Sequence, residues 1–323
     1  MHGRHPFSTT RRRLLRATAA LGAAALTPAF ADDNRSLRIG FQKGGGLLGL
    51  IKAQGRLEKS FGAQGGTVTW HEFPAGPQLL EALNAGSVDF GYTGAPPPIF
   101  AQAAGKDLVY VGAEPGSTSA EAIVVKAGSP AAAVADLKGK RVAVQKGSSA
   151  NYLLVAALEK AGVAFADIQP IYLPPADARA AFESDRVDAW SIWDPYLAAV
   201  QASQPVRVVA DYSGLLVANS FYEASRKLAS ERPKDLALVL DELARTGTWA
   251  AANPRAVAEV LAPQVALPVD VVEAWQRRTR YGVRPVDAGI IATQQKVADT
   301  FFEHKLIPKK VDVASAVWRW ERG

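Results

Sequence analysis

The chain of 323 residues contains no cysteine, and it has only four histidines. The lack of cysteine excludes disulfides, a thiolate nucleophile and a cysteine-ligated metal. His2 and His5 lie in an N-terminal leader, while His71 and His304 are far apart in sequence and near no acidic cluster with metal-ligand spacing. We therefore expect no metal, no cofactor and no catalytic triad, and we predict that the protein is not an enzyme.

The net charge of +6 suggests a nucleic-acid partner, but most of the excess lies in the leader. Residues 1–31 contain five arginines and no acid, so removing them lowers the net charge from +6 to +1. A nearly neutral body lacks the basic footprint of a nucleic-acid-binding protein. We expect no nucleic-acid partner.

The leader has the three parts of an export signal. A charged segment, Thr10–Arg16, precedes the Ala-rich segment Ala17–Leu26 and the small residues Ala29-Phe30-Ala31. The apolar segment is far shorter than the roughly 20 residues that span a bilayer. No later run approaches that length, so we expect a soluble, periplasmic mature protein. The adjacent arginines resemble a twin-arginine signal, with an ordinary Sec signal as the alternative.

Two pairs of segments echo each other along the chain. Leu37–Gly46 and Arg141–Ser149 are short β-rich runs that end in Gln-Lys-Gly and small residues. Gly86–Gly94 and Asp185–Asp194 each lead into a proline-bearing helix start. A turn from a strand into a helix presents free N–H groups and the positive end of the helix dipole, which suits an anion. The echo predicts two similar lobes that hold one anionic ligand between them.

Strand and helix patterns alternate from Leu37 to about Phe221. Expected strands are Leu37–Gln42, Val68–Phe73, Phe90–Thr93, Leu108–Glu114, Ala122–Lys126, Arg141–Gln145, Ile168–Leu173, Ala189–Trp193, Val206–Asp211 and Leu215–Phe221. Expected helices are Gly46–Phe61, Pro77–Ala85, Pro97–Ala104, Ser149–Ala161, Ala176–Glu183 and Pro195–Ala202, followed by Glu223–Ala252, Pro254–Leu261, Val269–Tyr281 and Asp287–His304. The alternation indicates βαβ units with mainly parallel sheets, and the fold class is α/β with a helical C-terminal third.

The repeat also predicts the domain organisation. After the signal at 1–31, we assign residues 32–124 and 221–323 to the first lobe and 125–220 to the second. The chain would cross between lobes twice, near Ala122–Lys126 and Val217–Ser220. The echoed turns would lie at the carboxyl ends of parallel strands, where open α/β sheets bind ligands.

The candidate anion-binding groups lie on the echoed turns. Thr93 and Gly94 end one strand, and Ser148, Ser149 and Asn151 begin the helix after its counterpart. Their hydroxyl and N–H groups suit the oxygens of a tetrahedral anion. A serine or threonine in such a place also serves as a helix N-cap, and that alternative stays open.

Four further residues complete the predicted site. Gln42 lies on a glycine-rich turn that is neither a Walker A loop nor a dinucleotide fingerprint. Trp193, at a strand end, would form a wall against an apolar ligand tail, with core burial as the alternative. Asp194 is either a ligand contact or a helix cap. Arg280 would offer a guanidinium to the anion, although a solvated helix face is the usual place for such arginines.

Several strings in sequence order resemble the aliphatic-sulfonate-binding proteins of ABC importers. They are Glu72–Leu83, Pro97–Ala104, Asp136–Ala143, Ile192–Tyr196, Ala298–Phe302 and Lys305–Pro308. The resemblance implies a two-lobed periplasmic-binding-protein fold of type II, a small-molecule sulfonate ligand, an ABC permease and its ATPase, and a role in sulfur uptake. We expect a monomer. Relatives often carry an acid after the Thr-Gly pair, where this chain has Ala95, so a plain or bulky alkanesulfonate is favoured over taurine.

Other functions remain open at this point. Taurine-, nitrate- and thiamine-precursor-binding proteins share the resemblance, and an enzyme on the same fold is a further alternative. An anion sensor that acts on a membrane receptor would differ only in its partner.

The leader yields a direct test of the export route. Replacing Arg11 and Arg12 with lysine should block secretion of a twin-arginine substrate, because that pathway depends on the arginine pair. The measurement is the periplasmic fraction of the lysine variant. Normal secretion would indicate the Sec route and leave export itself intact.

Overall fold

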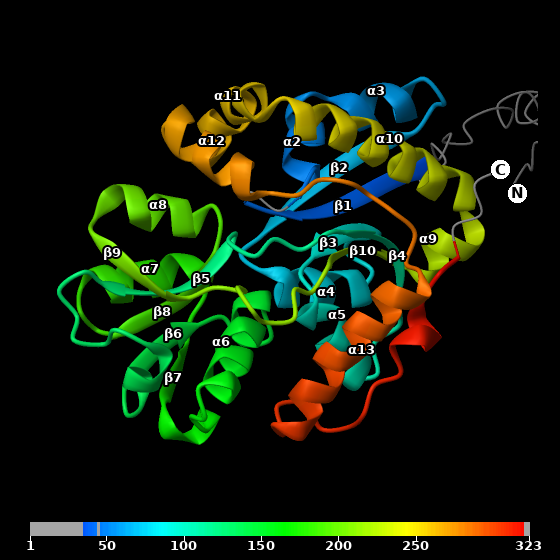
Figure 1. Cartoon of the computed structure of the whole chain (residues 1–323). Coiled ribbons are helices and arrows are strands. Elements are labelled where there is room, and N and C mark those ends of the chain that lie inside the picture. The colour runs from blue at the N-terminus through cyan, green and yellow to red at the C-terminus, as the bar shows by residue number, and fades with distance from the viewer. Residues whose placement is uncertain (1–34, 44–45, 320–323) are drawn as a thin grey trace, which may run out of the picture. The chain divides into compact units, whose positions relative to one another are not determined.

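The computed structural model describes residues 35–43 and 46–319. From Ser36 onward the described chain belongs to one compact unit that contains two β-sheets with helices around them (Figure 1). The leader lies outside the described residues, so the export signal and its arginines stay a prediction. Within the described ranges, no helix is long and apolar enough to span a membrane.

The first sheet has the strand order β2-β1-β3-β10-β4. Its strands are β1 (Ser36–Gln42), β2 (Thr67–Phe73), β3 (Phe90–Thr93), β4 (Leu108–Glu114) and β10 (Ser220–Ser225). β1 pairs in parallel with β2 and β3, whereas β10 runs antiparallel between β3 and β4. A strand from far along the chain therefore joins β4 to the rest of the sheet.

The second sheet repeats this arrangement with the order β7-β6-β8-β5-β9. Its strands are β5 (Glu121–Lys126), β6 (Arg141–Val144), β7 (Gln169–Tyr172), β8 (Ala189–Trp193) and β9 (Val206–Ala210). β6 pairs in parallel with β7 and β8, and β5 runs antiparallel to β8 and β9. β5 thus takes the position in the second sheet that β10 takes in the first.

The same ion pair holds the first strand of each repeat. In the first sheet, Asp89 accepts hydrogen bonds from the main-chain N–H of Arg38 (3.0 Å) and from its guanidinium. In the second, Asp188 accepts from the N–H of Arg141 (2.8 Å) and from its guanidinium in the same way. Both acids directly precede the third strand of their repeat, so the sequence echo corresponds to a structural repeat.

Helices cover both faces of the first sheet (Figure 1). The helices beside the first sheet are α2 (Leu48–Ala53), α3 (Arg56–Gly62), α4 (Gly76–Asn84), α5 (Pro96–Ala103), α9 (Arg226–Glu231), α10 (Pro233–Ala252), α11 (Pro254–Val265), α12 (Val269–Arg278) and α13 (Ala288–Glu303). Those packed on the second sheet are α6 (Ser149–Lys160), α7 (Pro175–Glu183) and α8 (Tyr196–Ser203). One core packs α2, α3 and α10 to α12 against β1. α4, α5 and α13 lie on the opposite side.

A second core spans both sheets, so the two halves share apolar contacts beside the cleft. Phe301 of α13 packs against Phe100 of α5 with ring centroids 5.1 Å apart and against Tyr152 of α6 at 6.1 Å. Tyr152 belongs to the half with the second sheet, while Phe100 and Phe301 lie beside the first. Burial of this aromatic surface stabilises the arrangement in which α5 and α6 approach each other.

The fold class is confirmed, and several expected elements differ in detail. The helix expected over Gly46–Phe61 is two helices, because Gly55 adopts the left-handed conformation (φ 59°) between them. The strand expected over Leu215–Phe221 is β10, which begins at Ser220 and takes the first residues of the helix expected from Glu223. The sheets are mixed, because β5 and β10 both enter antiparallel.

The chain crosses between the sheets through residues 115–120 and 211–219. The crossing expected at Ala122–Lys126 comes earlier, because the strand over these residues pairs only with β8 and β9 of the second sheet. The two connections approach closely at one point: a Cβ added to Gly116 would lie 2.0 Å from the Ala218 carbonyl oxygen. The assignment of residues 32–124 and 221–323 to one lobe and 125–220 to the other stays a prediction, with its first boundary moved to precede Glu121.

This close approach predicts that Gly116→Ala destabilises the protein. A methyl group has no room beside the Ala218 carbonyl, so the crossing segments must separate, at a cost of about 1–3 kcal/mol. Gly128→Ala is the matched control, because nothing lies within 4 Å of a Cβ at that position. Thermal unfolding should show a lower Tm for Gly116→Ala alone, and an equal Tm for both variants would contradict the close contact.

Candidate functional site

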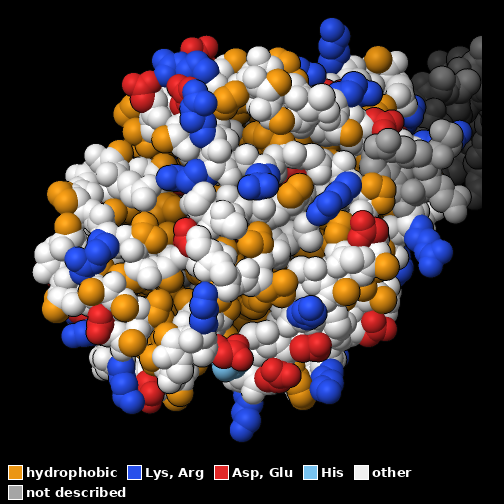
Figure 2. Space-filling view, viewed as in Figure 1, with side chains coloured by type: hydrophobic (Ala, Val, Ile, Leu, Met, Phe, Trp, Pro, Cys, Tyr) orange, Lys and Arg blue, Asp and Glu red, His pale blue; other side chains and the backbone are white. Residues whose placement is uncertain are grey.

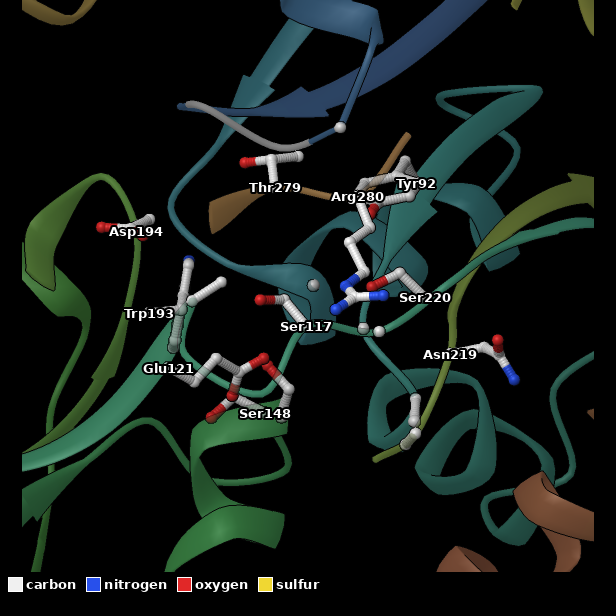
Figure 3. A pocket seen from close by; sticks show the side chains of 18 of the residues that line it. Tyr92, Ser117, Glu121, Ser148, Trp193, Asp194, Asn219, Ser220, Thr279 and Arg280 are labelled. Carbon is white, nitrogen blue, oxygen red and sulfur yellow. The ribbon is translucent and has the colours of Figure 1, made fainter. Parts of the chain in front are cut away.

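A pocket lies where the two sheets face each other, at the ends of the echoed strands (Figure 3). It is lined by Gln42, Gly46, Gly76, Tyr92, Gly94, Ala95, Pro97, Pro115, Gly116, Ser117, Ala120, Glu121, Ser148, Ser149, Trp193, Asp194, Tyr212, Ala218, Asn219, Ser220, Trp275, Thr279 and Arg280. Both crossing segments contribute residues. Relative motion of the two sheets about these segments would therefore change the shape of the pocket.

Most of the predicted site residues meet in this pocket. Those that line it are Gln42, Gly94, Ser148, Ser149, Trp193, Asp194 and Arg280. Thr93 and Asn151 are buried and lie outside the lining set. The structure brings the first group together, while direct contact of each residue with a ligand stays a prediction.

Thr93 and Asn151 hold the turns that carry the lining residues. The Thr93 hydroxyl donates a 2.6 Å hydrogen bond to the buried Glu223 carboxyl, and burial raises the pKa of that carboxyl well above its usual value. The Asn151 side-chain oxygen accepts a 3.0 Å bond from the Gly147 N–H. These polar groups fix the backbone behind the pocket surface.

Ser148 is the N-cap of α6. Its hydroxyl accepts from the Asn151 N–H (3.2 Å) and donates to the Gln145 carbonyl (2.7 Å). The N–H groups of Ser149 and Ala150 lie in the first turn of α6, where no carbonyl of the helix can accept from them. They are therefore the donors that this end of α6 offers to an anion. This turn therefore fits an anion mainly through its backbone.

The corresponding helix start in the first half of the chain has fewer donors. α5 begins with Pro96-Pro97-Pro98, and proline has no main-chain N–H. The N–H groups of Gly94 and Ala95, which both line the pocket, are the donors that remain before these prolines. Gly94 also meets the other half of the chain, since a Cβ added there would lie 2.9 Å from Cβ of Ser149.

The three arginines after Trp275 have three different surroundings. Arg277 pairs on the surface with Glu273, and Arg278 pairs with Asp194. Arg280 is exposed, and its guanidinium enters the pocket beside Ser220 (Figure 3). In the described part of the chain, this guanidinium has no hydrogen-bond or ion-pair partner.

Asp194 joins the two halves of the chain. At the end of β8, it accepts from Arg278 Nε (2.9 Å) and Nη2 (2.7 Å), and Arg278 follows the helices beside the first sheet. Arg278 Nη1 also donates to Gln201 of α8 (3.1 Å). The carboxylate additionally caps α8 by accepting from the Ala198 N–H (2.9 Å). Burial raises the pKa of Asp194, and Arg278 opposes that rise.

Sequence reasoning missed two acids at this site. Glu121 lines the pocket, and burial raises the pKa of its carboxyl to about 7; the Ser149 hydroxyl opposes the rise and the charge of Asp194 adds to it. Glu114 is buried behind Tyr92, and burial raises its pKa to about 7 against the effects of Gly282 and Tyr92. Each acid is isolated in sequence and belongs to no motif, so no sequence signal distinguished them.

Two further expectations concern partners that need clustered groups. Among residues 35–43 and 46–319, no group of three or more His, Cys, Asp or Glu residues is placed to hold a metal ion. Acidic and basic side chains are interspersed over the face seen in Figure 2.

Comparisons with known proteins agree with this geometry. Residues 61–257 match the family model described as NMT1/THI5 like. An Escherichia coli (strain K12) protein described as an aliphatic sulfonates-binding protein is 45% identical over 93% of this chain and 93% of its own. The Xanthomonas axonopodis alkanesulfonate-binding protein SsuA, solved bound to MOPS, is 45% identical over 88% of this chain and 99% of its own, with a TM-score of 0.85. The periplasmic aliphatic sulphonate binding protein SsuA of E. coli is 47% identical over 88% of this chain and 92% of its own, with a TM-score of 0.80.

The ion pair between Asp194 and Arg278 yields a stability prediction. Arg278→Gln leaves a buried carboxylate without its counter-charge, which should cost up to about 3 kcal/mol. Arg277→Gln is the matched control, because its pair with Glu273 is exposed and worth little. Denaturant unfolding should separate the two variants.

The pH dependence of this loss follows from the carboxylate. Without Arg278, the folded-state pKa of Asp194 would rise above the already raised value that it has in the wild type, while the unfolded pKa is the same for both proteins. The loss should therefore be small in acid and grow as the pH rises above the folded-state pKa of Asp194 in the wild type. Equal losses for both variants at neutral pH would contradict the role of the pair.

Proposed function

The chain belongs to the NMT1/THI5-like family, and from this we propose that it is a periplasmic solute-binding protein that captures aliphatic sulfonates and delivers them to an ABC importer. The ligand would bind in the pocket between the two sheets. The chain spans nearly the full length of the sulfonate-binding relatives described above, which supports carrying their function to it. The cognate permease, its ATPase and a monomeric state are part of the proposal.

One observation carries the proposal: the pocket contains an arginine, Arg280, that forms no ion pair with any of the described residues. The Arg280 guanidinium points into space that is also lined by the start of α6 and by the Gly94–Ala95 turn. A sulfonate has three oxygens and one negative charge, so it can accept from the guanidinium and from backbone N–H groups together. Gln42 is held at the rim by a 3.0 Å bond from its Nε2 to the Tyr92 carbonyl.

Aromatic walls suit the carbon chain of the ligand. Trp193 lies at the end of β8 in the second sheet, and Trp275 lies on α12 beside the first sheet. The two indoles therefore line the pocket from opposite sheets. Trp193 packs edge-on against Tyr196, with ring centroids 6.5 Å apart. Apolar walls of this kind favour an alkanesulfonate over nitrate or sulfate, which have no carbon to bury.

Closure of the lobes would report the bound ligand to the importer. Gly94 and Ser149 meet across the pocket, and Arg278 reaches Asp194 from the other half of the chain. A ligand that contacts both halves favours the closed arrangement by its differential affinity for it. The near relatives are described as binding proteins, which supports capture and delivery over catalysis.

Binding measurements with Arg280→Ala test the proposal. Calorimetry on the wild type should show binding of MOPS and of 1-octanesulfonate, both tighter than nitrate or sulfate. Arg280→Ala should weaken both sulfonates about 10-fold to 100-fold, because it removes charge-assisted hydrogen bonds worth about 1.5–3 kcal/mol. Arg280 is exposed, so the melting temperature should stay unchanged.

Arg277→Ala serves as the control for the loss of one surface arginine from the same segment. It should bind both sulfonates as the wild type does, because its partner Glu273 lies on the surface of α12. Nitrate binding equal to or stronger than sulfonate binding would overturn the proposed ligand class.

A further inference from the structure

The pocket contains a carboxyl group as well as a cation, and we propose that this carboxyl makes Glu121 a specificity-determining residue. Its carboxylate would receive the protonated amine of an aminoalkanesulfonate, while Arg280 holds the sulfonate at the other end. This assignment rests on the proposed function and names the ligand class within it.

The position of Glu121 follows from the strand that carries it. Glu121 is the first residue of β5 and pairs across the sheet with Trp193, so its side chain emerges at the pocket end of the second sheet. Figure 3 shows its carboxyl beside Ser148, on the side of the pocket away from the backbone of Arg280. The acid and the arginine enter the same space from different halves of the chain.

One oxygen of this carboxyl is left without a partner. Glu121 Oε2 is buried, and within the described residues nothing donates a hydrogen bond to it. A buried polar atom without a partner costs about 1–3 kcal/mol, and more when it is charged. An N–H donor on the ligand would supply the missing bond, and an ammonium group would also supply the missing charge.

Among the described residues, Glu121 forms no ion pair. The nearby carboxylate of Asp194 already pairs with Arg278 and caps α8. Tyr212 donates its hydroxyl to the Ser149 carbonyl at 3.0 Å. Burial raises the pKa of Glu121 to about 7, the Ser149 hydroxyl opposes the rise, and the charge of Asp194 adds to it, so the carboxyl ionises less readily than an ordinary glutamate and a nearby cation would favour its ionised form.

The spacing of charges in the pocket suits a zwitterion. Arg280 offers a cation for the sulfonate and Glu121 offers an anion for the amine, so an aminoalkanesulfonate pairs both groups at once. A plain alkanesulfonate would pair only Arg280. Ala95 led to the expectation that an amine-bearing ligand is disfavoured, because the turn after β3 has no acid at that position. In the structure an acid lines the pocket from β5 instead.

The decisive experiment compares ligands that differ only in the amine. Taurine is matched by 1-propanesulfonate, and 3-aminopropanesulfonate by 1-butanesulfonate, because each pair has the same chain length. Calorimetry near pH 8 on the wild type should show at least one amine ligand bound about tenfold or more tightly than its match. Glu121→Gln should reduce that ratio to about one while 1-propanesulfonate and 1-butanesulfonate still bind.

Glu183→Gln is the matched control, because it makes the same change at an exposed acid on α7 that pairs with Arg179. It should keep the wild-type ratio. Equal affinities within both ligand pairs for the wild type, or an unchanged ratio in Glu121→Gln, would overturn the role of Glu121 and leave sulfonate binding intact. Failure of all four ligands, with binding of 1-octanesulfonate retained, would overturn the role of Glu121 alone. Failure of 1-octanesulfonate and MOPS as well would overturn the proposed function, and this assignment with it.

A pH profile separates a charge effect from a change of shape. The preference for the amine ligand should increase from about pH 6 to about pH 8, because the carboxylate forms as the pH passes its pKa of about 7. The charged or titratable groups facing Glu121 are Asp194 with Arg278, Tyr212 and Arg280. Burial raises the pKa of Asp194 against the effect of Arg278, and it raises the pKa of Tyr212 further above its usual value. Glu121→Gln should give a flat profile, and a profile that rises equally in this variant would contradict the proposal.

Discussion

The insertion of β10 between β3 and β4 is the constraint on which the rest of the structure depends. β4 pairs with no other strand of the first sheet in the described chain, so the sheet would lose that strand without the returning segment. The return requires a second connection between the sheets, and it places the C-terminal helices beside the first sheet. Arg280 reaches the pocket for this reason, because it follows α12, which packs there, and Arg278 at the end of α12 reaches Asp194.

Carboxyl groups surround a pocket whose proposed ligand is an anion. Glu114, Glu121 and Glu223 all have raised pKa values, and in each case burial is the largest cause. A carboxyl that stays protonated is a hydrogen-bond donor and adds no repulsion, so Glu114 and Glu223 behind the pocket are compatible with an anionic ligand, while Glu121 would ionise to meet an amine. Asp194 differs because Arg278 supplies its counter-charge. This ion pair connects the end of β8 in the second sheet to α12 beside the first sheet.

The repeated strands and helices could be predicted well from the sequence, whereas the position and direction of β10 could not. The β-rich runs that end in Gln-Lys-Gly mark β1 and β6, and the Val-Asp pairs mark the acids that clamp Arg38 and Arg141. β10 was placed too early because it is buried on both faces, so it lacks the alternating pattern of a half-exposed strand. The strands that pair with β10 are far away in sequence, and no local sequence pattern indicates that β10 runs antiparallel to them.

The candidate site was predictable where its residues lie on echoed turns. Gly94, Ser148 and Trp193 were identified in this way, whereas Glu121 belongs to no motif and became visible only when β5 brought it beside Ser149. The roles of polar groups were harder to predict than their positions. Ser148 lies at the pocket, but its hydroxyl serves the first turn of α6.

The returning strand also has a consequence for the order in which the protein can assemble. The second sheet is built from contiguous chain, Glu121–Ala210, whereas the first sheet needs Ser220–Ser225 to reach β4. Pairing that spans so many residues carries a larger loop-closure cost than pairing within a continuous stretch. The second sheet is therefore the natural nucleus, and the nascent first sheet must wait, with the edges of β3 and β4 uncovered, until more than two thirds of the chain has been synthesised. During that interval these edges are the part of the molecule most exposed to wrong pairing with another chain.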